Sequence, residues 1–282
     1  MSAATLLALM LSCVSQVQPK DDAEGELRKA WLKVCTRHAM DYRICPTGKP
    51  KEEFKFIPTP IFRHAQPARG AGDIGGVWLW AQADGRPAVV GTVFAFNAGQ
   101  GYRWVAHEFH SLADEPLTAV WREREQWAPT RAGLDWKPIP DAPAPADSPE
   151  QRLRQIRSLS ERFKAHSIDF RGGRWELRLI PKPVYRYELK KPDAVLDGAL
   201  LAICQGTDPE IFLAIEARKA DGAYRWHYAC AAFSDYELHA QLDDTEVWAP
   251  PKGVSNSRRE PHWWYGYVER TRLPEENSEA KN

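Results

Sequence analysis

The stretch FIPTPIFR at residues 56–63 places two prolines inside a run that otherwise favours a β-strand. A similar phrase, LIPKPVYR, stands at residues 179–186. Proline donates no hydrogen bond to a sheet, and within sheets it is confined to edges, first positions and bulges. One such phrase would indicate a loop. The same phrase at two places in one chain predicts a bent strand at a sheet edge.

The likeness between the two phrases extends to their surroundings. EFKFIPTPIFR (53–63) aligns with ELRLIPKPVYR (176–186), and the Glu, the Ile, both prolines and the final Arg are identical. The triplet YRW then recurs in the same order, at residues 102–104 and 224–226. Ordered matches whose offsets shrink slowly are expected from duplication followed by small loop deletions, so the sequence predicts a tandem repeat.

Each repeat is expected to begin with an amphipathic helix. Residues 148–166 open with Ser148 as N-cap, Pro149 at the first helical position and Gln151 at the third, which is the pattern of a capping box. Apolar residues follow at helical spacing. A helix from about residue 22 to residue 40 has a comparable apolar stripe.

Short runs of alternating apolar and polar residues follow each predicted helix. GGVWLWAQ (75–82) and AVVGTVFAF (88–96) predict a hairpin, and GALLAICQ (198–205) and IFLAIEAR (211–218) predict its counterpart. We therefore expect an α+β fold, a tandem duplication in which each unit packs one amphipathic helix on a curved antiparallel β-sheet. At the level of fold alone, such a unit is similar to cystatin-like and nuclear transport factor 2-like domains.

Composition and patterning divide the chain into five parts. The linker is rich in Pro and Ala and should be extended, and the last residues are charged and without apolar periodicity. The expected parts are a signal peptide (1–17), a first repeat (22–137), a Pro/Ala linker (138–147), a second repeat (148–269) and a disordered tail (270–282).

The N-terminal apolar run, residues 3–14, is shorter than the about 20 residues that span a bilayer. It matches the apolar region of a signal peptide cleaved near residue 15, and this predicts a secreted or periplasmic protein. No Lys or Arg precedes the run, so a cytoplasmic protein stays the alternative. Lys+Arg and Asp+Glu are equal at 38 each. This balance argues against nucleic acid as a partner, and against a membrane beyond export, because both attract a basic surplus.

Four cysteines remain if the N-terminal segment is removed, and an exported chain permits disulfides. Cys35 and Cys45 are close in sequence and could form a local bridge. Cys204 and Cys230 fall on two predicted strands of one meander and could form a second bridge. Four free buried thiols are the alternative.

Several phrases carry a resemblance to a known family. They are HEFHSLADEPLTA (107–119), KPIPDAPAPA (137–146) followed by QRLRQIRSL (151–159), and DGALLAICQGTDPE (197–210). The chain resembles, over most of residues 50–250, an uncharacterised family of exported bacterial proteins. The resemblance implies export and carries no activity.

The densest group of ligand-type side chains lies in WVAHEFHSLADE (104–115) and includes His107, Glu108, His110 and Asp114. On a strand, Glu108 and His110 point to one face and His107 to the other. Glu108 and His110 are therefore candidate metal ligands, with Asp114 or a distant group completing the site. The spacing is not H-E-x-x-H, and the segment is predicted to be a strand rather than a helix.

Other features narrow the functional classes. The chain has no G-x-S-x-G, no phosphate-binding glycine loop and no dinucleotide-binding fingerprint, so no cofactor is expected. The aromatic segment PHWWYGY (261–267) is expected to close the core of the second repeat, with an exposed contact surface as the alternative. We expect a non-catalytic, exported, two-lobed binding or scaffold protein of unknown ligand or protein partner. A metal-dependent hydrolase or metal-binding protein, with its site in the first repeat, is the alternative.

Overall fold

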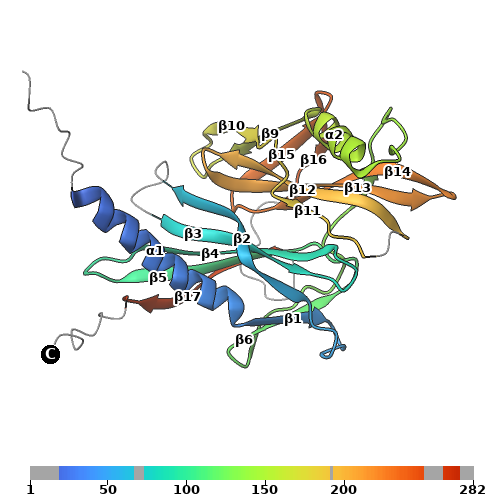
Figure 1. Cartoon of the computed structure of the whole chain (residues 1–282). Helices are drawn as coiled ribbons and strands as arrows, with labels where there is room; N and C mark the ends of the chain where they lie inside the picture. The colour runs from blue at the N-terminus through green and yellow to red at the C-terminus, as the bar shows by residue number, and fades with distance from the viewer. Residues whose placement is uncertain (1–18, 67–72, 191–192, 251–262, 274–282) are drawn as a thin grey trace, which may run out of the picture.

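The computed structural model describes residues 19–66, 73–190, 193–250 and 263–273 of the chain (Figure 1). Strands account for 53% of the residues and helices for 13%, so the protein is mostly β. In chain order the elements are α1 (Pro19–Met40), β1 (Tyr42–Pro46), β2 (Lys55–Gln66), β3 (Asp73–Ala81), β4 (Pro87–Asn97), β5 (Arg103–Ser111), β6 (Leu117–Trp121), β7 (Arg124–Trp127), β8 (Lys137–Pro138), α2 (Pro149–Ser160), β9 (Phe163–Ile168), β10 (Arg174–Leu179), β11 (Tyr185–Arg186), β12 (Val195–Gln205), β13 (Asp208–Ala220), β14 (Ala223–Ala232), β15 (Glu237–Leu242), β16 (Thr245–Trp248) and β17 (Trp263–Thr271).

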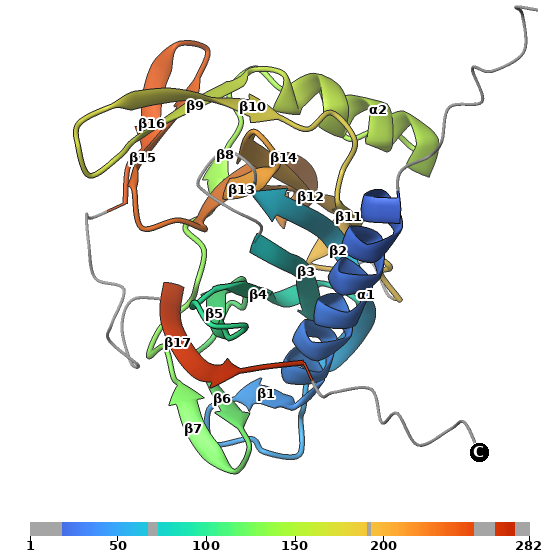
Figure 2. The same ribbon diagram turned by 90° about the vertical axis from the view of Figure 1, so that its left-hand side faces the viewer.

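The described strands form three antiparallel sheets. A five-stranded sheet has the order β17-β5-β4-β3-β2, and a three-stranded sheet has the order β1-β6-β7. The third sheet has nine strands, in the order β16-β15-β9-β10-β12-β13-β14-β8 with β11 paired to β12. One of the sheets curls into a half-barrel. In Figure 2 the five-stranded sheet lies in the middle of the molecule, between β12–β14 on one side and the three-stranded sheet on the other.

The expected α+β tandem duplication, with one helix and one sheet in each unit, is wrong. The strands of the two halves are not kept apart: β17, at the end of the chain, pairs with β5, and β8 pairs with β14. Neither of the two larger sheets is therefore built from the strands of one half alone. The second helix also ends earlier than expected, because Phe163 and Ala165 are buried while Lys164 is exposed, which is the alternation of a strand.

The N-terminus of α2 is as predicted. Ser148 lies in an extended conformation before the helix, its side chain accepts a hydrogen bond from the backbone N–H of Gln151 at 3.3 Å, and Pro149 is the first helical residue. This bond satisfies one of the backbone donors that a helix start leaves without a partner. The capping residues therefore fix where the second helix begins.

The two proline phrases bend their strands, as the sequence predicts. In the first phrase the register between β2 and β3 shifts between Ile57 and Phe62, so Pro58 and Pro60 lie in an irregularity of an edge strand. In the second phrase the prolines separate β10 from β11, and both strands pair with β12. The expected edge position holds for the first phrase only, because β9 pairs with the other side of β10.

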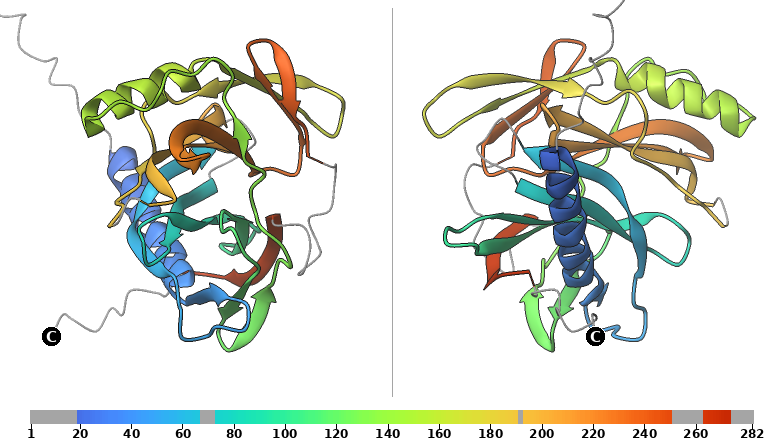
Figure 3. Two further views of the ribbon diagram at one scale, coloured as in Figure 1. Left: turned by 90° about the vertical axis from the view of Figure 1, so that its right-hand side faces the viewer. Right: turned by 60° about the vertical axis from the view of Figure 1, so that its left-hand side comes forward.

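Three apolar cores hold the layers together. The first lies between α1, the three-stranded sheet and one face of the five-stranded sheet, and it contains Trp78 and Trp80, both fully buried. Figure 3 shows α1 lying across the five-stranded sheet. The second core lies beneath α2, between β9, β15 and the β12–β14 strands. The third joins the two halves, because Leu79 and Val90 pack there with Leu200 and neighbouring residues of the second half.

The expected linker is attached to the second half rather than free. Pro138 belongs to β8, and the N–H of Ile139 donates to the carbonyl of Trp226 at 2.9 Å. The guanidinium of Arg152 donates to the carbonyls of Ala146 and Asp147. These contacts fix residues 138–147 on the surface beneath α2.

Two other expected segments fall at the ends of the chain. The disordered tail was expected from residue 270, but Arg270 and Thr271 pair with β5 as part of β17. Residues 274–282 and the expected signal peptide, residues 1–17, lie outside the described residues. In the described part of the chain, neither helix combines the length and the apolar character that crossing a membrane requires.

Neither expected disulfide is formed, and the four cysteines in the described part of the chain are free thiols. Cys35 points from α1 toward the carbonyl of Ile74, whereas Cys45 points toward that of Thr118. Cys204 and Cys230 cannot meet because β13 lies between their strands and they face different cores. Burial raises the pKa of the Cys35, Cys204 and Cys230 thiols to about 12, which keeps them protonated and unreactive at neutral pH.

Candidate ligand-binding site

Strand β5 presents the predicted cluster to two different layers. His107 and Phe109 face the first core, where both contact Tyr42. Glu108 faces the other way, toward the nine-stranded sheet, and lines a cavity there. The alternation expected for a strand therefore holds, and it separates His107 from Glu108.

His107 belongs to a buried chain of hydrogen bonds. Its Nδ1 lies 2.7 Å from the hydroxyl of Tyr42, and its Nε2 lies 3.1 Å from Nδ1 of His38. Nε2 of His38 is 3.5 Å from a carboxylate oxygen of Glu269, which also accepts from Arg122 at 2.9 Å. Burial lowers the pKa of both histidines, and this favours neutral rings. With neutral rings, the hydroxyl of Tyr42 can donate to His107, His107 can donate to His38, and His38 can donate to Glu269. Each polar group of the cluster then has a hydrogen-bond partner within the core.

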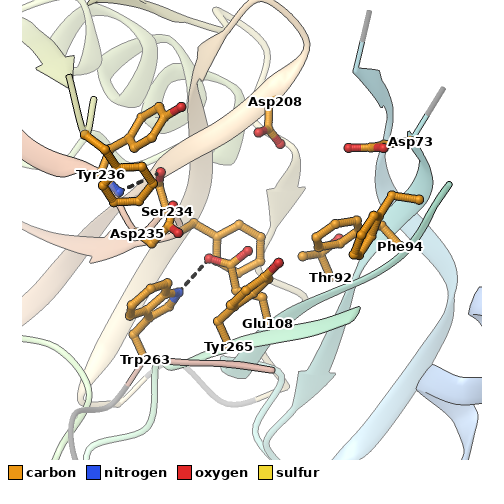
Figure 4. A pocket seen from close by; sticks show the side chains of 13 residues that line it. Asp73, Thr92, Phe94, Glu108, Asp208, Ser234, Asp235, Tyr236, Trp263 and Tyr265 are labelled. Carbon is orange, nitrogen blue, oxygen red and sulfur yellow. Dashed lines mark hydrogen bonds between the residues drawn. The ribbon is translucent and has the colours of Figure 1, made fainter. Parts of the chain in front are cut away.

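Glu108 lies at a cavity of about 280 Å³ between the five-stranded and nine-stranded sheets. Segments far apart in sequence build its walls: β3, β4, β5 and β17 on one side, and the start of β13, the β9–β10 turn and the β14–β15 connection on the other. Figure 4 shows the side chains that surround it. Four carboxyl groups line it, those of Asp73, Glu108, Asp208 and Asp235. Aromatic rings line it too, among them Phe94, Phe170, Phe233, Tyr236, Trp263 and Tyr265.

The carboxyl of Glu108 is the most buried of the four. Glu108 is 8% exposed, and its Oε1 accepts a hydrogen bond from Nε1 of Trp263 at 2.6 Å. Burial raises the pKa of Glu108 well above its usual range, and the charges of Asp208 and Asp235 raise it further. The bond from Trp263 opposes this shift, because it favours the ionised form. The net result is a carboxyl whose pKa lies well above its usual range, so that the protonated form is favoured.

Aromatic side chains are held in place by one another around this carboxyl. The rings of Phe94 and Tyr265 are nearly parallel, with centroids 6.2 Å apart, and Phe170 packs edge-to-face on Tyr236 at 5.1 Å. Phe170 is 73% exposed, although it is a large apolar residue. The rings therefore give the cavity apolar walls that reach from the buried carboxyl to the surface.

The other predicted site residues lie elsewhere. His110 is buried, with its Nδ1 2.7 Å from the carbonyl of Ser111, and it does not line the cavity. Asp114 lies at the surface and accepts from Arg86 at 2.6 Å. Of the four residues predicted from the sequence, only Glu108 lines the cavity.

The predicted metal ligands are not joined by a third group. Among the described residues, no group of three or more His, Cys, Asp or Glu side chains is placed to hold a metal ion. Glu108 and His110 share a face of β5, as predicted, but His110 turns toward its own backbone. The metal site at these two residues stays a prediction without structural support in the described part of the chain.

Sequence reasoning missed most of the cavity. The aromatic segment at residues 261–267 was expected in the second half, but β17 pairs with β5, so that Tyr265 lies opposite Glu108 and Trp263 opposite His110. That segment was the available signal, because it concentrates tryptophan and tyrosine side chains within a few positions. Asp73 and Asp208 gave no signal, since each is a single acidic residue beside a glycine-rich or turn segment.

Comparison with known proteins adds no assignment. The sequence matches no protein-family model and no curated protein, and the fold matches no solved structure. The resemblance to exported bacterial proteins therefore stays an expectation. Function is argued from the cavity itself.

Proposed function

We propose that this protein binds a small molecule in the cavity between its five-stranded and nine-stranded sheets. The observation that carries the proposal is Glu108, a carboxyl more than nine-tenths buried at the wall of an open cavity. Burying an ionisable group without a compensating charge destabilises a fold. Groups of this kind are concentrated at functional sites, where their cost to stability is offset by function.

The size and the walls of the cavity support a ligand of modest size. Its volume of about 280 Å³ lies near the lower end of ligand pockets, which hold about 300 to 1,000 Å³. Its lining combines apolar rings with a few polar groups, which is the usual composition of a small-molecule site. A ligand with one ring and a polar head would fill such a space.

Binding rather than catalysis is favoured by the groups on the lining. No His, Lys or Cys side chain lines the cavity among the described residues. The hydroxyl of Ser234 accepts a hydrogen bond from the backbone N–H of Tyr236 at 3.3 Å. Export of the protein stays a separate prediction, because it depends on residues 1–17 and not on the cavity.

The proposal can be tested by fluorine NMR on protein labelled with 5-fluorotryptophan. Three probes share one ring and differ in the head group: benzyl alcohol, benzylammonium and benzoate. The Trp263 resonance is assigned with a Trp263→Phe variant. At least one probe is expected to shift this resonance saturably, with a Kd of about 1 mM or lower. The resonances of Trp127 and Trp226, which are buried in the two outer cores, should not move.

A pair of matched variants controls for non-specific binding. Ser234→Phe places a ring in the cavity and should weaken binding of every probe that shifts Trp263. Ser158→Phe adds the same ring on the exposed face of α2 and should change nothing. If none of the three probes shifts the Trp263 resonance, or if Ser234→Phe binds as the wild type does, the cavity is not a ligand site.

A further inference from the structure

We propose that the ligand of this cavity is an organic cation of the ammonium class, bound by the carboxyl of Glu108 and by the faces of the surrounding aromatic rings. The inference rests on the proposed function above and names the chemistry of the ligand. Two independent observations carry it: the charge of the lining and the arrangement of its rings.

The lining of the cavity is acidic. Four carboxyl groups line the cavity, and among the described lining residues there is no Lys, Arg or His. In Figure 4 the side chains of Asp73, Asp208 and Asp235 stand around that of Glu108. An anionic ligand would meet like charges here, and like charges in a confined site repel strongly. A cation would be attracted by the same groups.

Glu108 has an oxygen left for the ligand. Its Oε1 accepts from Trp263, whereas its Oε2 has no hydrogen-bond partner among the described residues. A buried carboxylate without a cation is strongly disfavoured, and it either binds a proton or pairs with a positive group. An ammonium group in the cavity would supply that positive group and donate a charge-assisted hydrogen bond to Oε2.

The rings supply the second half of the recognition. The face of an aromatic ring is negative, so it attracts ammonium groups, and sites for alkylated ammonium ions are commonly built from several such faces. Phe94 and Tyr265 are stacked on one side of the cavity, while Tyr236 and Phe170 pack together on another. A neutral ligand would gain only burial from these rings, whereas a cation gains burial and electrostatic attraction.

The same three probes test the assignment. In the wild type, benzylammonium is expected to bind at least about tenfold more tightly than benzyl alcohol, and benzoate more weakly than either. Glu108→Gln keeps the size of the side chain and an oxygen for Trp263 but removes the charge. This variant should lose the preference for benzylammonium, while the affinity for benzyl alcohol stays within about threefold.

Two more variants complete the design. Glu216→Gln removes a buried carboxyl on β13 that does not line the cavity, so the preference for benzylammonium should be unchanged. Asp235→Asn changes a carboxyl that lines the cavity from the connection between β14 and β15, and it should reduce the preference by about threefold. The dispersed fluorotryptophan resonances report in each case that the variant is folded.

The outcomes separate the two proposals. If benzyl alcohol or benzoate binds as tightly as benzylammonium and shifts Trp263, the cavity is a ligand site but the cation assignment is wrong. If Glu108→Gln and Asp235→Asn both keep the full preference for benzylammonium, the assignment of these carboxyls is also wrong. If no probe shifts Trp263, both proposals fail together.

Discussion

Glu108 and Glu216 are two buried carboxyls on different sheets, and they differ in what surrounds them. Glu216, on β13, is 2% exposed, and its Oε2 accepts from Arg218 at 2.7 Å. It is also hydrogen-bonded to the hydroxyl of Tyr187. Glu108, on β5, is 8% exposed and accepts only from the neutral indole of Trp263 among the described residues.

The difference shows in their titration. Burial raises the pKa of Glu216 only to about 7, because Arg218 and Arg86 oppose it. Burial raises the pKa of Glu108 well above its usual range, and its carboxylate neighbours push in the same direction. The fold supplies a cation for one buried carboxyl and leaves a cavity beside the other. We take this as the difference between a structural carboxyl and one kept for a ligand.

The largest expected effect is the pH dependence of Glu108→Gln. Above pH 4.5 the unfolded state releases the proton of this residue while the folded state keeps it, so wild-type stability falls as the pH rises. Glutamine has no such proton. The free energy of unfolding of the variant, relative to that of the wild type, should therefore rise by about 1.4 kcal/mol for each pH unit above 4.5, up to the folded pKa. Urea unfolding at pH 5, 6, 7 and 8 measures the difference.

Subtracting the free energy of unfolding of the wild type from that of the variant at each pH cancels the contribution of other titrating groups. The pKa of His38 and His107 is lowered in the fold, so their contribution to stability has the opposite sign and rises with pH. Both histidines are present in the variant and in the wild type. A difference that stays flat from pH 5 to pH 8 would show that Glu108 is ionised in the folded protein, and the contrast with Glu216 would be lost.

Glu216→Gln should show the same trend, but it should level off. Its folded pKa is about 7 against an unfolded value of 4.5. The difference in free energy of unfolding between the variant and the wild type should grow between these pH values and then level off, at about 3 kcal/mol in total. The same urea series measures it. A difference that keeps growing to pH 8 would mean that Arg218 does not compensate this carboxyl.

Removing Arg218 should leave Glu216 without its nearest positive charge, as Glu108 is among the described residues. Arg218→Leu should destabilise the protein by about 1 to 2 kcal/mol at pH 8, where Glu216 is ionised in the wild type, and by less at pH 5. Lys219→Leu, the neighbouring residue, breaks only an exposed ion pair with Asp193 and should change stability by less than about 0.5 kcal/mol. Equal losses in the two variants would contradict a special role for Arg218.

Trp263→Phe should have the smallest effect. It removes the one hydrogen bond to Glu108 and leaves most of the ring in place, at a cost of about 1 kcal/mol. The bond favours the ionised carboxyl, so its loss should also raise the pKa of Glu108 further. Above the folded pKa of Glu108, where the wild-type bond is to a carboxylate, the same substitution should cost less in the Glu108→Gln background, because the bond there is to a neutral amide. Identical costs in both backgrounds would mean that the bond from Trp263 does not act through the charge of Glu108.

The sequence predicts the local features of this fold well. The bends at Pro58–Pro60 and Pro181–Pro183, the hairpins and the N-cap at Ser148 each depend on residues close together in the chain. The division into sheets does not, because it depends on the pairing of β17 with β5 and of β8 with β14. No local pattern in β17 distinguishes one sheet edge from another. The prediction of two self-contained units was wrong because it could not anticipate these pairings.

The same limit applies to the cavity. Alternation along a strand was enough to place Glu108 and His107 on opposite faces. The hydrogen-bond partner of Glu108, however, is Trp263, which is separated from it by 155 positions. The carboxyls of Asp73 and Asp208 come from two further strands. Only the three-dimensional pairing of the strands brings such residues together. The sequence therefore identified Glu108 as a candidate but did not predict the other residues of the cavity.

The position of β17 has a consequence for the synthesis of the chain. The five-stranded sheet takes its edge strand, β17, from residues that are synthesised after all the other described strands, and until then the edge of β5 has no partner. An unpaired edge strand invites pairing with other chains, so a nascent or truncated chain that ends before residue 263 is at risk of aggregation. Trp263 and Tyr265, which line the cavity, belong to that strand. The proposed cavity is therefore complete only in a chain that extends through β17.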